Sequence, residues 1–354
     1  MKLLVTGGNG FIGSAVVRHC ILERGWTIIN IDALTQVATL GSVEVVSKNQ
    51  NYHFHHVNIL DRAALDKIFE LEKPDAVVHL AAESHVDRSI DGPMAFVQTN
   101  VVGTVNLLEA ARHYFDTLNE DQKKSFRFLH VSTDEVFGSL SLDGGMFTEA
   151  SPYAPSSPYS ASKAASDHLV VAFGHTYGMP VLLTNCSNNY GPYHFPEKLI
   201  PLMIIKAMRN QPLPVYGKGL NVRDWLFVED HARALVRVLE YAKPGSNYVI
   251  GGNAERSNIE VVHGICDLLD LKLGCSSAPA RRELVTHVHD RPGHDLRYAI
   301  DSTKLQSELE WSAQVSLNEG LEHTVDWYIA NETWWGPLID GTAYSGQRLG
   351  SKAK

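Results

Sequence analysis

The chain has 354 residues, which is more than one domain usually contains. Its 31 lysines and arginines against 40 aspartates and glutamates give a net charge of −9, which argues against a general nucleic-acid-binding protein. Hydrophobic residues make up 44% of the chain and charged residues 20%, so we expect a folded globular protein. No apolar run is long enough to cross a membrane, and no membrane association is predicted.

Strands and helices alternate in the first part of the chain. Continuous apolar runs predict strands, and spacing of apolar residues by three or four predicts helices. We expect strands over residues 3–6, 27–31, 76–80 and 126–132, and helices over 14–24, 61–71 and 96–113. Asp61 is placed to cap the second helix. This alternation predicts an α/β fold with a doubly wound parallel sheet of the Rossmann type.

The sequence pattern changes after residue 185, where prolines and glycines break the chain into short elements. We therefore predict a Rossmann domain over residues 1–185. Residues 186–335 are expected to form mainly a smaller mixed α/β substrate-binding lobe, with some chain returning to the sheet. Residues 336–354 have little pattern and are expected to be a tail.

The four cysteines form no C-x-x-C pair, so neither a disulfide framework nor a zinc site is expected. This usage is typical of a reducing compartment, and the cytoplasm is the predicted location. The histidines could suggest a metal, but His53 and His55 share one face of a predicted strand without a third ligand nearby in the sequence. His56, His287 and His289 are interpreted in the same way, and no metal site is predicted.

A glycine pattern follows the first predicted strand and opens a helix. Gly7, Gly10 and Gly13 suit a tight turn, close approach to a pyrophosphate, and close helix–strand packing. Asp32 ends the next strand, where a carboxylate can accept hydrogen bonds from the adenosine ribose. Because Ala33 and not arginine follows Asp32, NAD is predicted rather than NADP. A plain structural turn is the alternative explanation for the glycines.

Tyr159 and Lys163 are four residues apart on a helix that Ser157 can cap and that Pro158 can begin. The helix dipole and the lysine are both expected to lower the pKa of the phenol, so that Tyr159 can take a proton from a sugar hydroxyl. The alternative is a half-buried tyrosine beside a surface lysine.

Thr133, Asp134 and Glu135 follow the strand over residues 126–132, so they lie at a carboxyl-terminal strand end, where ligands bind in such sheets. The two adjacent carboxylates are either a solvated turn or an acid and a base beside a nicotinamide.

With these residues in view, the chain resembles the extended short-chain dehydrogenase/reductase family, and within it the dTDP-glucose 4,6-dehydratases. The likeness covers residues 1 to about 335 and rests on Gly7–Gly13, Tyr159, Lys163 and several further stretches. These stretches are residues 133–135, 186–192, 196–201, 223–225 and 290–295. The Asp134-Glu135 pair is the specific part of the resemblance. Epimerases of this family usually lack both carboxylates, and the related decarboxylases and GDP-mannose dehydratases generally keep only the glutamate.

The resemblance implies a hydro-lyase that converts dTDP-glucose to dTDP-4-keto-6-deoxyglucose for deoxysugar biosynthesis. It implies that Tyr159, supported by Lys163, is the base for oxidation at C4, with Thr133 near the C4 oxygen. Glu135 would remove the C5 proton, and Asp134, as a neutral acid, would protonate the departing C6 hydroxyl. The same family likeness implies NAD as cofactor, which returns to its oxidised form, and a homodimer built on the helices over 96–113 and from Pro158.

Further roles follow from matching positions in the resemblance. The residues implied to line the NAD site are Gly7, Gly10, Phe11, Ile12, Gly13, Asp32, Thr35, Asn58, Ile59, Leu80, Ala81, Ala82, Ser84, Thr99, Tyr159, Lys163 and Asn189. The residues implied to hold the nucleotide sugar are Ser84, Thr133, Asn188, Lys198, Leu199, Tyr216, Arg223, Asn258, Arg291 and His294. Lys198, Arg223 and Arg291 make physical sense as partners of the diphosphate.

Two departures from the family pattern flank the adenosine. Ala33 stands where the family usually has lysine, and Asn58 where it usually has aspartate. Both predict weaker NAD binding and leave the reaction itself unaffected. Three alternatives remain at this point: the same chemistry on UDP- or CDP-glucose, a nucleotide-sugar 4-epimerase or decarboxylase, and a non-catalytic NAD-binding protein. Asp134 argues against the second, and the intact set of reaction groups argues against the third.

Overall fold

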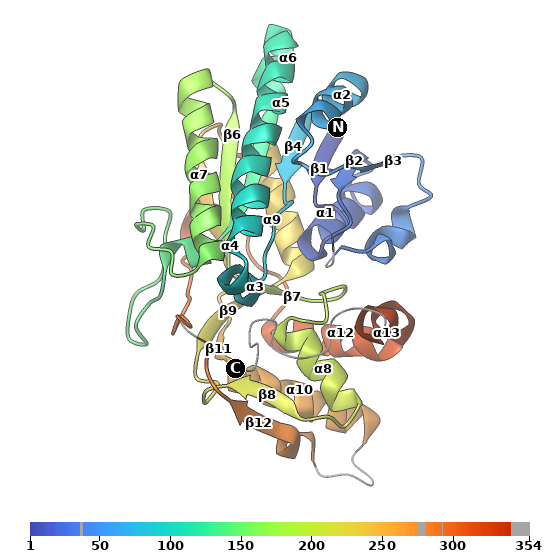
Figure 1. Cartoon of the computed structure of the whole chain (residues 1–354), viewed down its shortest axis with the longest axis vertical. Helices are drawn as coiled ribbons and strands as arrows, with labels where there is room; N and C mark the ends of the chain where they lie inside the picture. The colour runs from blue at the N-terminus through green and yellow to red at the C-terminus, as the bar shows by residue number, and fades with distance from the viewer. Residues whose placement is uncertain (36–37, 275–279, 292, 341–354) are drawn as a thin grey trace.

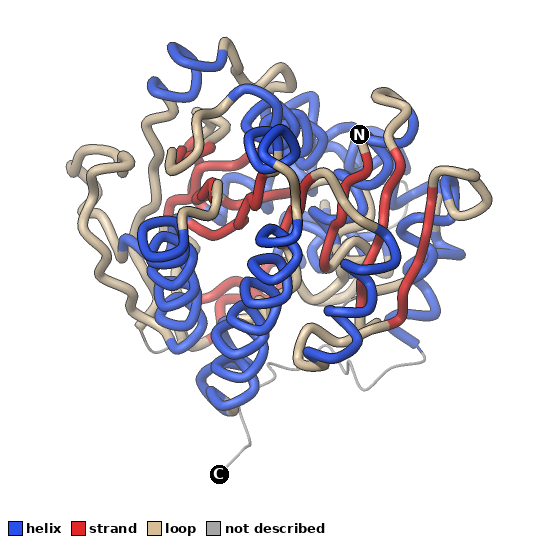
Figure 2. The backbone as a smooth tube through the Cα atoms, turned by 90° about the horizontal axis from the view of Figure 1, so that it is seen from above, coloured by secondary structure: helices blue, strands red, loops and turns tan. Residues whose placement is uncertain are grey.

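A parallel sheet of seven strands forms the centre of the protein, in a computed structural model that describes residues 1–35, 38–274, 280–291 and 293–340. The strand order is β10-β6-β5-β4-β1-β2-β3, and every neighbouring pair is parallel (Figures 1 and 2). The strands are β1 (Lys2–Thr6), β2 (Thr27–Asp32), β3 (Tyr52–His56), β4 (Ala76–His79), β5 (Arg127–Thr133), β6 (Val181–Cys186) and β10 (Asn247–Ile250). The Rossmann-type fold predicted from the alternating pattern is therefore confirmed.

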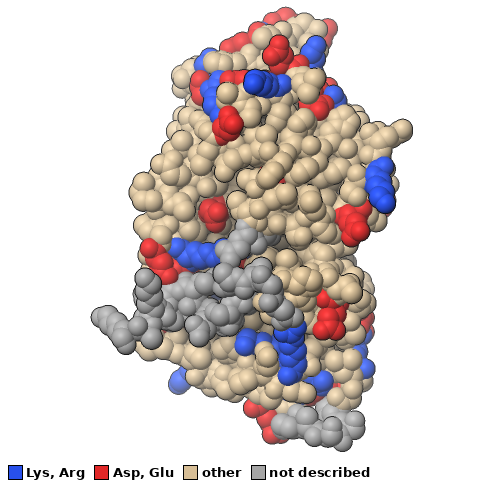
Figure 3. All heavy atoms as spheres, turned by 45° about the vertical axis from the view of Figure 1, so that its right-hand side comes forward, with Lys and Arg blue, Asp and Glu red and all other residues tan. Residues whose placement is uncertain are grey.

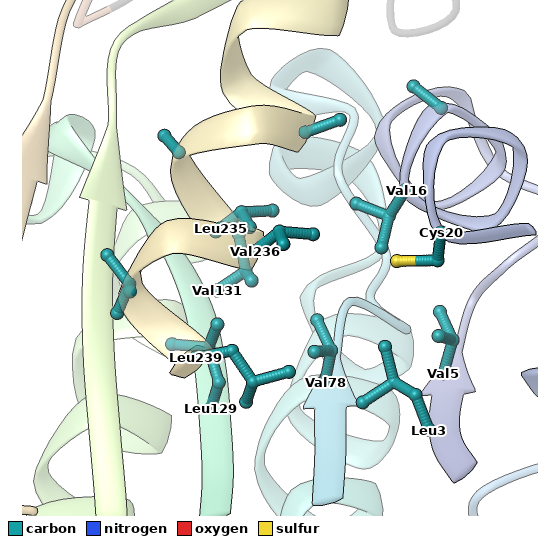
Figure 4. Packing of buried hydrophobic residues seen from close by; sticks show 14 of the residues in the cluster. Leu3, Val5, Val16, Cys20, Val78, Leu129, Val131, Leu235, Val236 and Leu239 are labelled. Carbon is teal, nitrogen blue, oxygen red and sulfur yellow. The ribbon is translucent and has the colours of Figure 1, made fainter. Parts of the chain in front are cut away.

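Helices cover both faces of this sheet (Figure 2). One face carries α1 (Phe11–Leu22), α9 (Val228–Tyr241) and α11 (Thr303–Leu309), and the other carries α2 (Arg62–Glu72), α5 (Gly103–Thr117) and α7 (Pro158–Tyr177). Figure 4 shows the packing on the first face, where Val16 and Cys20 of α1 and Leu235 of α9 meet side chains from β1, β4 and β5. Burial of each such side chain favours folding by about 1.5–3 kcal/mol.

The chain after residue 185 builds a second group of elements below the sheet in Figure 1 and also returns to the sheet as β10 and α9. The strands of this second group are β7 (Asn188–Tyr190), β8 (Leu213–Tyr216), β9 (Val222–Phe227), β11 (Glu255–Ser257) and β12 (Val285–Val288). They form a three-stranded sheet, β11-β9-β7, and the pair β12-β8. The helices are α8 (Leu199–Met208), α10 (Asn258–Leu273), α12 (Leu317–Ala330) and α13 (Glu332–Asp340), and they share a separate apolar core.

The helix expected over residues 96–113 is wrong in its bounds and its regularity. It consists of α4 (Pro93–Phe96), a π-helical segment (Val97–Val102) and α5, which ends at Thr117. Ile59 packs so closely on Gly103 that a Cβ there would lie 2.6 Å from its Cδ1, a contact that spacing in the sequence does not reveal. The first helix also begins earlier than expected, at Phe11, because the glycine loop leads directly into it.

The remaining short elements are α3 (Val86–Asp91), α6 (Glu120–Ser125) and three 3₁₀ turns, Leu40–Val46, Asp134–Phe137 and Arg281–Leu284. The tail expected from residue 336 begins inside α13, and residues 341–354 lie outside the described residues, as do Gln36, Val37, Cys275 and Pro292. Among the described helices, none is both long and apolar enough to cross a membrane. On the face seen in Figure 3, described acidic and basic side chains occur in small mixed groups.

Candidate active site

The turn between β1 and α1 requires glycine at two positions. Gly7 has a φ of +72°, which favours glycine, and a Cβ there would lie 2.8 Å from the backbone of Ala81. A Cβ on Gly13 would lie 2.1 Å from the carbonyl oxygen of Gly7. The helix begins at Phe11 after Gly10, which offers no capping side chain. Free backbone N–H groups at this helix end suit a pyrophosphate, as the glycine spacing predicted.

Asp32 is buried at the end of β2 and held in one orientation by two backbone N–H groups. The N–H of Asn9 donates to Oδ2 at 2.9 Å, and the N–H of Leu34 donates to Oδ1 at 2.8 Å. Burial raises the pKa of Asp32, and these two hydrogen bonds oppose that rise. Each carboxylate oxygen has lone pairs left for a ribose hydroxyl.

One cavity of about 300 Å³ runs from this turn to the carboxyl ends of β5 and β6. All the residues that the sequence placed around NAD line it, and these are Gly7, Gly10, Phe11, Ile12, Gly13, Asp32, Thr35, Asn58, Ile59, Leu80, Ala81, Ala82, Ser84, Thr99, Tyr159, Lys163 and Asn189. The glycine cradle, the oriented carboxylate and the reaction groups therefore surround a single volume, and this arrangement fits a dinucleotide.

Thr133 ends β5 and caps the 3₁₀ turn that carries Asp134 and Glu135. Its hydroxyl accepts the N–H of Glu135 at 3.2 Å and donates to Oδ1 of Asp134 at 3.3 Å. Asp134 is 1% exposed, and its Oδ2 has no hydrogen-bond partner among the described residues. A solvated turn is excluded by this burial, and Oδ2 is free to act on a ligand.

The two carboxyl groups differ in their electrostatic surroundings. Burial, followed by repulsion from Glu135, raises the pKa of Asp134 well above its usual value. Burial also raises the pKa of Glu135, but three nearby cations oppose this rise: Arg291, Arg223 and Lys198. Repulsion from Glu135 favours the protonated form of Asp134, whereas the three cations favour the ionised form of Glu135, which is the difference expected for an acid and a base.

Tyr159 lies in the first turn of α7, which Ser157 caps and Pro158 begins, as predicted. The expected lowering of the phenol pKa is wrong for the protein alone, because burial and the nearby Glu135 raise the pKa of Tyr159 well above its usual value. Lys163, which is 4% exposed, directs its Nζ to the carbonyl oxygen of Val131 at 2.9 Å. The lysine and the helix end therefore do not outweigh the loss of water around the phenol.

The substrate residues expected from the sequence fall into two groups. Ser84, Thr133, Asn188 and Lys198 line the cavity, whereas Leu199, Tyr216, Arg223, Asn258, Arg291 and His294 do not. Leu199 packs against the core of the second group of elements, and Asn258 begins α10. Tyr216 donates to Asp87 at 3.2 Å, and Arg291 lies 3.6 Å from the same carboxylate. Arg223 and Arg291 nevertheless act electrostatically on Glu135 and so lie near the reaction groups.

Several cavity residues were not found from the sequence. His194 stacks on Phe11 with ring centroids 3.9 Å apart, and Glu197 forms an ion pair with Arg88. Glu197 stands directly before Lys198 in the stretch 196–201, which carries part of the family resemblance. Its place in that stretch could have indicated that it lies at the site. A lone histidine such as His194 carries no comparable signal.

Asn100, in the π-helical segment, holds the loop after β4 against α7. Its Oδ1 accepts the N–H of Glu83 at 2.8 Å, while its Nδ2 donates to the carbonyl oxygen of Glu83 at 3.0 Å and to Oγ of Ser162 at 2.9 Å. Ser162 neighbours Lys163, and Glu83 lines the cavity. Such π segments frequently lie at functional sites.

The histidines considered for a metal have other partners. His53 Nδ1 lies 3.2 Å from Glu72, and His55 Nε2 lies 2.9 Å from the same carboxylate. Lys2 also donates to Glu72, at 3.1 Å. No cluster of three potential metal ligands occurs among the residues that the structure describes.

Known proteins resemble this chain over almost its whole length. The family profile described as GDP-mannose 4,6 dehydratase matches residues 4–324. A dTDP-glucose 4,6-dehydratase of Neisseria meningitidis is 55% identical over 352 residues, covering 99% of each chain. The chain belongs to the dTDP-glucose 4,6-dehydratase family. A second dTDP-glucose 4,6-dehydratase, from Salmonella typhimurium, is 56% identical and covers 98% of this chain and 97% of that protein.

Solved structures agree with this family membership. The dTDP-glucose 4,6-dehydratase DesIV of Streptomyces venezuelae, crystallised with NAD, is 43% identical with a TM-score of 0.86, over 96% of this chain and 100% of that chain. The Bacillus anthracis dTDP-glucose 4,6-dehydratase, also in complex with NAD, is 42% identical with a TM-score of 0.85, over 96% and 99%. A Thermus thermophilus UDP-glucose 4-epimerase is 27% identical with a TM-score of 0.81, over 94% and 100%. The fold is thus also found in an epimerase whose sequence is much less similar to this chain than those of the dehydratases.

Proposed function

We propose that the protein is a hydro-lyase that converts dTDP-glucose to dTDP-4-keto-6-deoxyglucose with NAD as cofactor. The observation that carries this proposal is the adjacent pair of the buried Asp134 and the half-buried Glu135, which lines one cavity together with Tyr159. Membership of the dTDP-glucose 4,6-dehydratase family supports the choice of sugar and nucleotide. An epimerase needs no acid at C6, so the neutral Asp134 favours dehydration.

The glycine turn and Asp32 would hold the dinucleotide, which supplies an acceptor and donor of hydride when bound. Tyr159 takes the proton of the C4 hydroxyl as that carbon is oxidised, and Thr133 orients the same oxygen. Removal of solvent around the phenol opposes its ionisation, whereas a cationic ring nearby favours it. A bound oxidised nicotinamide would supply such a cation.

Glu135 removes the C5 proton, which the new C4 carbonyl makes acidic, while Asp134 donates its proton to the C6 oxygen. The cations Lys198, Arg223 and Arg291 act on Glu135 electrostatically and favour its ionised form. They are also suited to the diphosphate of the substrate. Loss of water leaves a double bond between C5 and C6. The hydride removed from C4, which the cofactor would carry, is then returned to C6, and Glu135 gives its proton back to C5, so that the cofactor would end oxidised.

Purified protein incubated separately with dTDP-glucose, UDP-glucose and CDP-glucose tests this proposal. Mass spectrometry should detect loss of one water from the dTDP sugar. Conversion of UDP-glucose to a product of unchanged mass would instead support a 4-epimerase. No change in any sugar, with NAD added, would overturn the enzymatic function.

We extend the proposal to the assembly and location of the protein. Exposed apolar side chains on α3, α4, the π segment and α7 favour a homodimer through these helices, and they are Ile90, Met94, Val97, Val102 and Val171. Sedimentation of the parent and of Met94→Glu should show a dimer and its dissociation; a monomeric parent would refute the dimer.

Cys20, Cys186 and Cys266 are free and buried, which supports the reducing cytoplasm. The division into a Rossmann domain and a substrate-binding lobe belongs to the same proposal.

A further inference from the structure

Asp167 continues the face of α7 that carries the reaction groups, because Tyr159, Lys163 and Asp167 follow one another at intervals of four residues. The side chain of Asp167 is buried, at 1% exposure. Its Oδ2 accepts three hydrogen bonds, from Ser132 Oγ at 2.8 Å, Tyr153 Oη at 3.0 Å and Asn185 Nδ2 at 3.1 Å. The mechanism derived above gives no role to this carboxylate.

These partners connect α7 to the segment that carries the acid and the base. Ser132 directly precedes Thr133 in β5. Asn185, on β6, also donates from Nδ2 to the carbonyl oxygen of Thr133 at 3.1 Å. One carboxylate therefore ties the helix of Tyr159 and Lys163 to the strand end that presents Thr133, Asp134 and Glu135.

The charge of Asp167 faces the buried amine of Lys163. His130 Nε2, on β5, lies between them, 3.4 Å from Lys163 Nζ and 3.2 Å from Asp167 Oδ1. The other titratable groups around this pair are His79 on β4, Tyr153 before α7, Cys186 on β6 and the reaction groups Asp134, Glu135 and Tyr159.

Most of these groups carry no negative charge near neutral pH. Burial holds the pKa of His79 and His130 well below the usual value and raises the pKa of Cys186 to about 12. Burial raises the pKa of Asp167 to about 6, so it is ionised at neutral pH. Burial lowers the pKa of Lys163, and the first effect opposing this is the charge of Asp167.

We propose that Asp167 is a positioning residue: it keeps Lys163 charged beside Tyr159 and holds the end of β5 in register with α7. This inference rests on the proposed function, since it assigns Lys163 a part in the oxidation at C4. It concerns the pairing of charges within the protein, so it can fail while the proposed function stands.

Asp167→Asn tests the pairing with little change in shape. The rate of enzyme-bound NADH formation from dTDP-glucose should be measured across pH for the parent and the variant. An opposite charge nearby raises the pKa of a cation by about 1–3 units, so the loss of rate at alkaline pH should move down by at least about one unit. Asp167→Glu, which keeps the charge, should restore the alkaline limb. Ser166 is a buried neighbour on the same turn whose hydroxyl bonds the carbonyl oxygens of Asn100 and Ser162. Its replacement, Ser166→Ala, should leave the alkaline limb in place.

A variant that is slower at every pH, with both limbs unmoved, would overturn the charge role. Failure of the parent to use dTDP-glucose refutes the proposed function instead, and the pairing is then judged by stability. Lys163→Met combined with Asp167→Asn removes both charges, and a neutral buried pair is tolerated better than one orphan charge. The double variant should therefore unfold at a higher denaturant concentration than Lys163→Met alone. A double variant that is no more stable than either single variant would overturn the pairing.

Discussion

Replacing Asp134 with asparagine should separate dehydration from oxidation. The amide keeps an oxygen where Oδ1 now accepts from Thr133 at 3.3 Å, but it cannot give up a proton at neutral pH. Burial raises the pKa of Asp134 and so favours its protonated form, and its Oδ2 has no partner among the described residues, so no neighbour is bonded there to deliver the proton instead. A positioned acid contributes a rate factor of about 10²–10⁴. At about 1.4 kcal/mol per tenfold change, this is a barrier increase of about 3–6 kcal/mol.

The assay follows the two steps separately. Rapid mixing with dTDP-glucose should show enzyme-bound NADH forming at close to the parent rate, because Tyr159 and Lys163 are unchanged. Quenched samples analysed by mass spectrometry should show loss of water slowed by the factor above. A C6-fluoro analogue, whose fluoride leaves with less help from an acid, should recover most of the lost rate. Asp143→Asn, the same chemical change on an exposed residue, is the matched control.

If Asp134→Asn releases water from dTDP-glucose at the parent rate, Asp134 is not the acid. The epimerase or decarboxylase interpretation would then gain support. Loss of both NADH formation and dehydration would point instead to damage to the turn that Thr133 caps.

Three further outcomes are expected. Tyr159→Phe should abolish NADH formation, and its appearance at the parent rate would exclude Tyr159 as the base. Lys163→Ala should move the acidic limb of the oxidation to higher pH, because the phenol loses a neighbouring cation and its pKa rises further; an unmoved limb would contradict this. Purified protein should gain activity when NAD⁺ is added, since Ala33 has no polar side chain and Asn58 already uses its Oδ1 to accept the N–H of Leu60 at 2.9 Å. Each missing hydrogen bond weakens NAD⁺ binding by about 0.5–1.5 kcal/mol. Full NAD occupancy after dialysis would contradict the predicted weak binding.

The strands of the sheet and the cofactor turn could be predicted because their causes are local. Apolar runs become buried parallel strands. Gly13 is required by a contact with Gly7 in the same short loop, and the tight turn gives Gly7 its positive φ. The residues that the resemblance implies around NAD come from motifs at these strand ends, and they line one cavity. Around the break of the helix over 96–113, Gly103 packs on Ile59 and Asn100 bonds Glu83, and these contacts join residues that are distant in the sequence.

The electrostatic prediction for Tyr159 was wrong for a similar reason. Sequence spacing places Lys163 one turn away, but it does not show that the phenol is buried or that Glu135 lies near it. For Asp134, burial and the neighbouring Glu135 raise the pKa, which agrees with the neutral acid that the resemblance implies. Tyr216, Arg291 and His294 come from segments that meet only in the folded second lobe. The sequence therefore could not show that these residues lie outside the cavity lining.

The π-helical segment places a constraint on insertions and deletions in this helix. Each residue of an α-helix turns the chain by about 100°. Removing one residue between Val97 and Val102 would make the helix regular, but it would rotate Asn100 or everything after it by that angle. The amide of Asn100 would then lose either Glu83 or Ser162, and with it the bridge between the loop after β4 and the helix of Lys163. Natural variants of this protein should therefore differ in length at the far end of α5, near Thr117, and keep the count of residues from Phe96 to Gly103 unchanged.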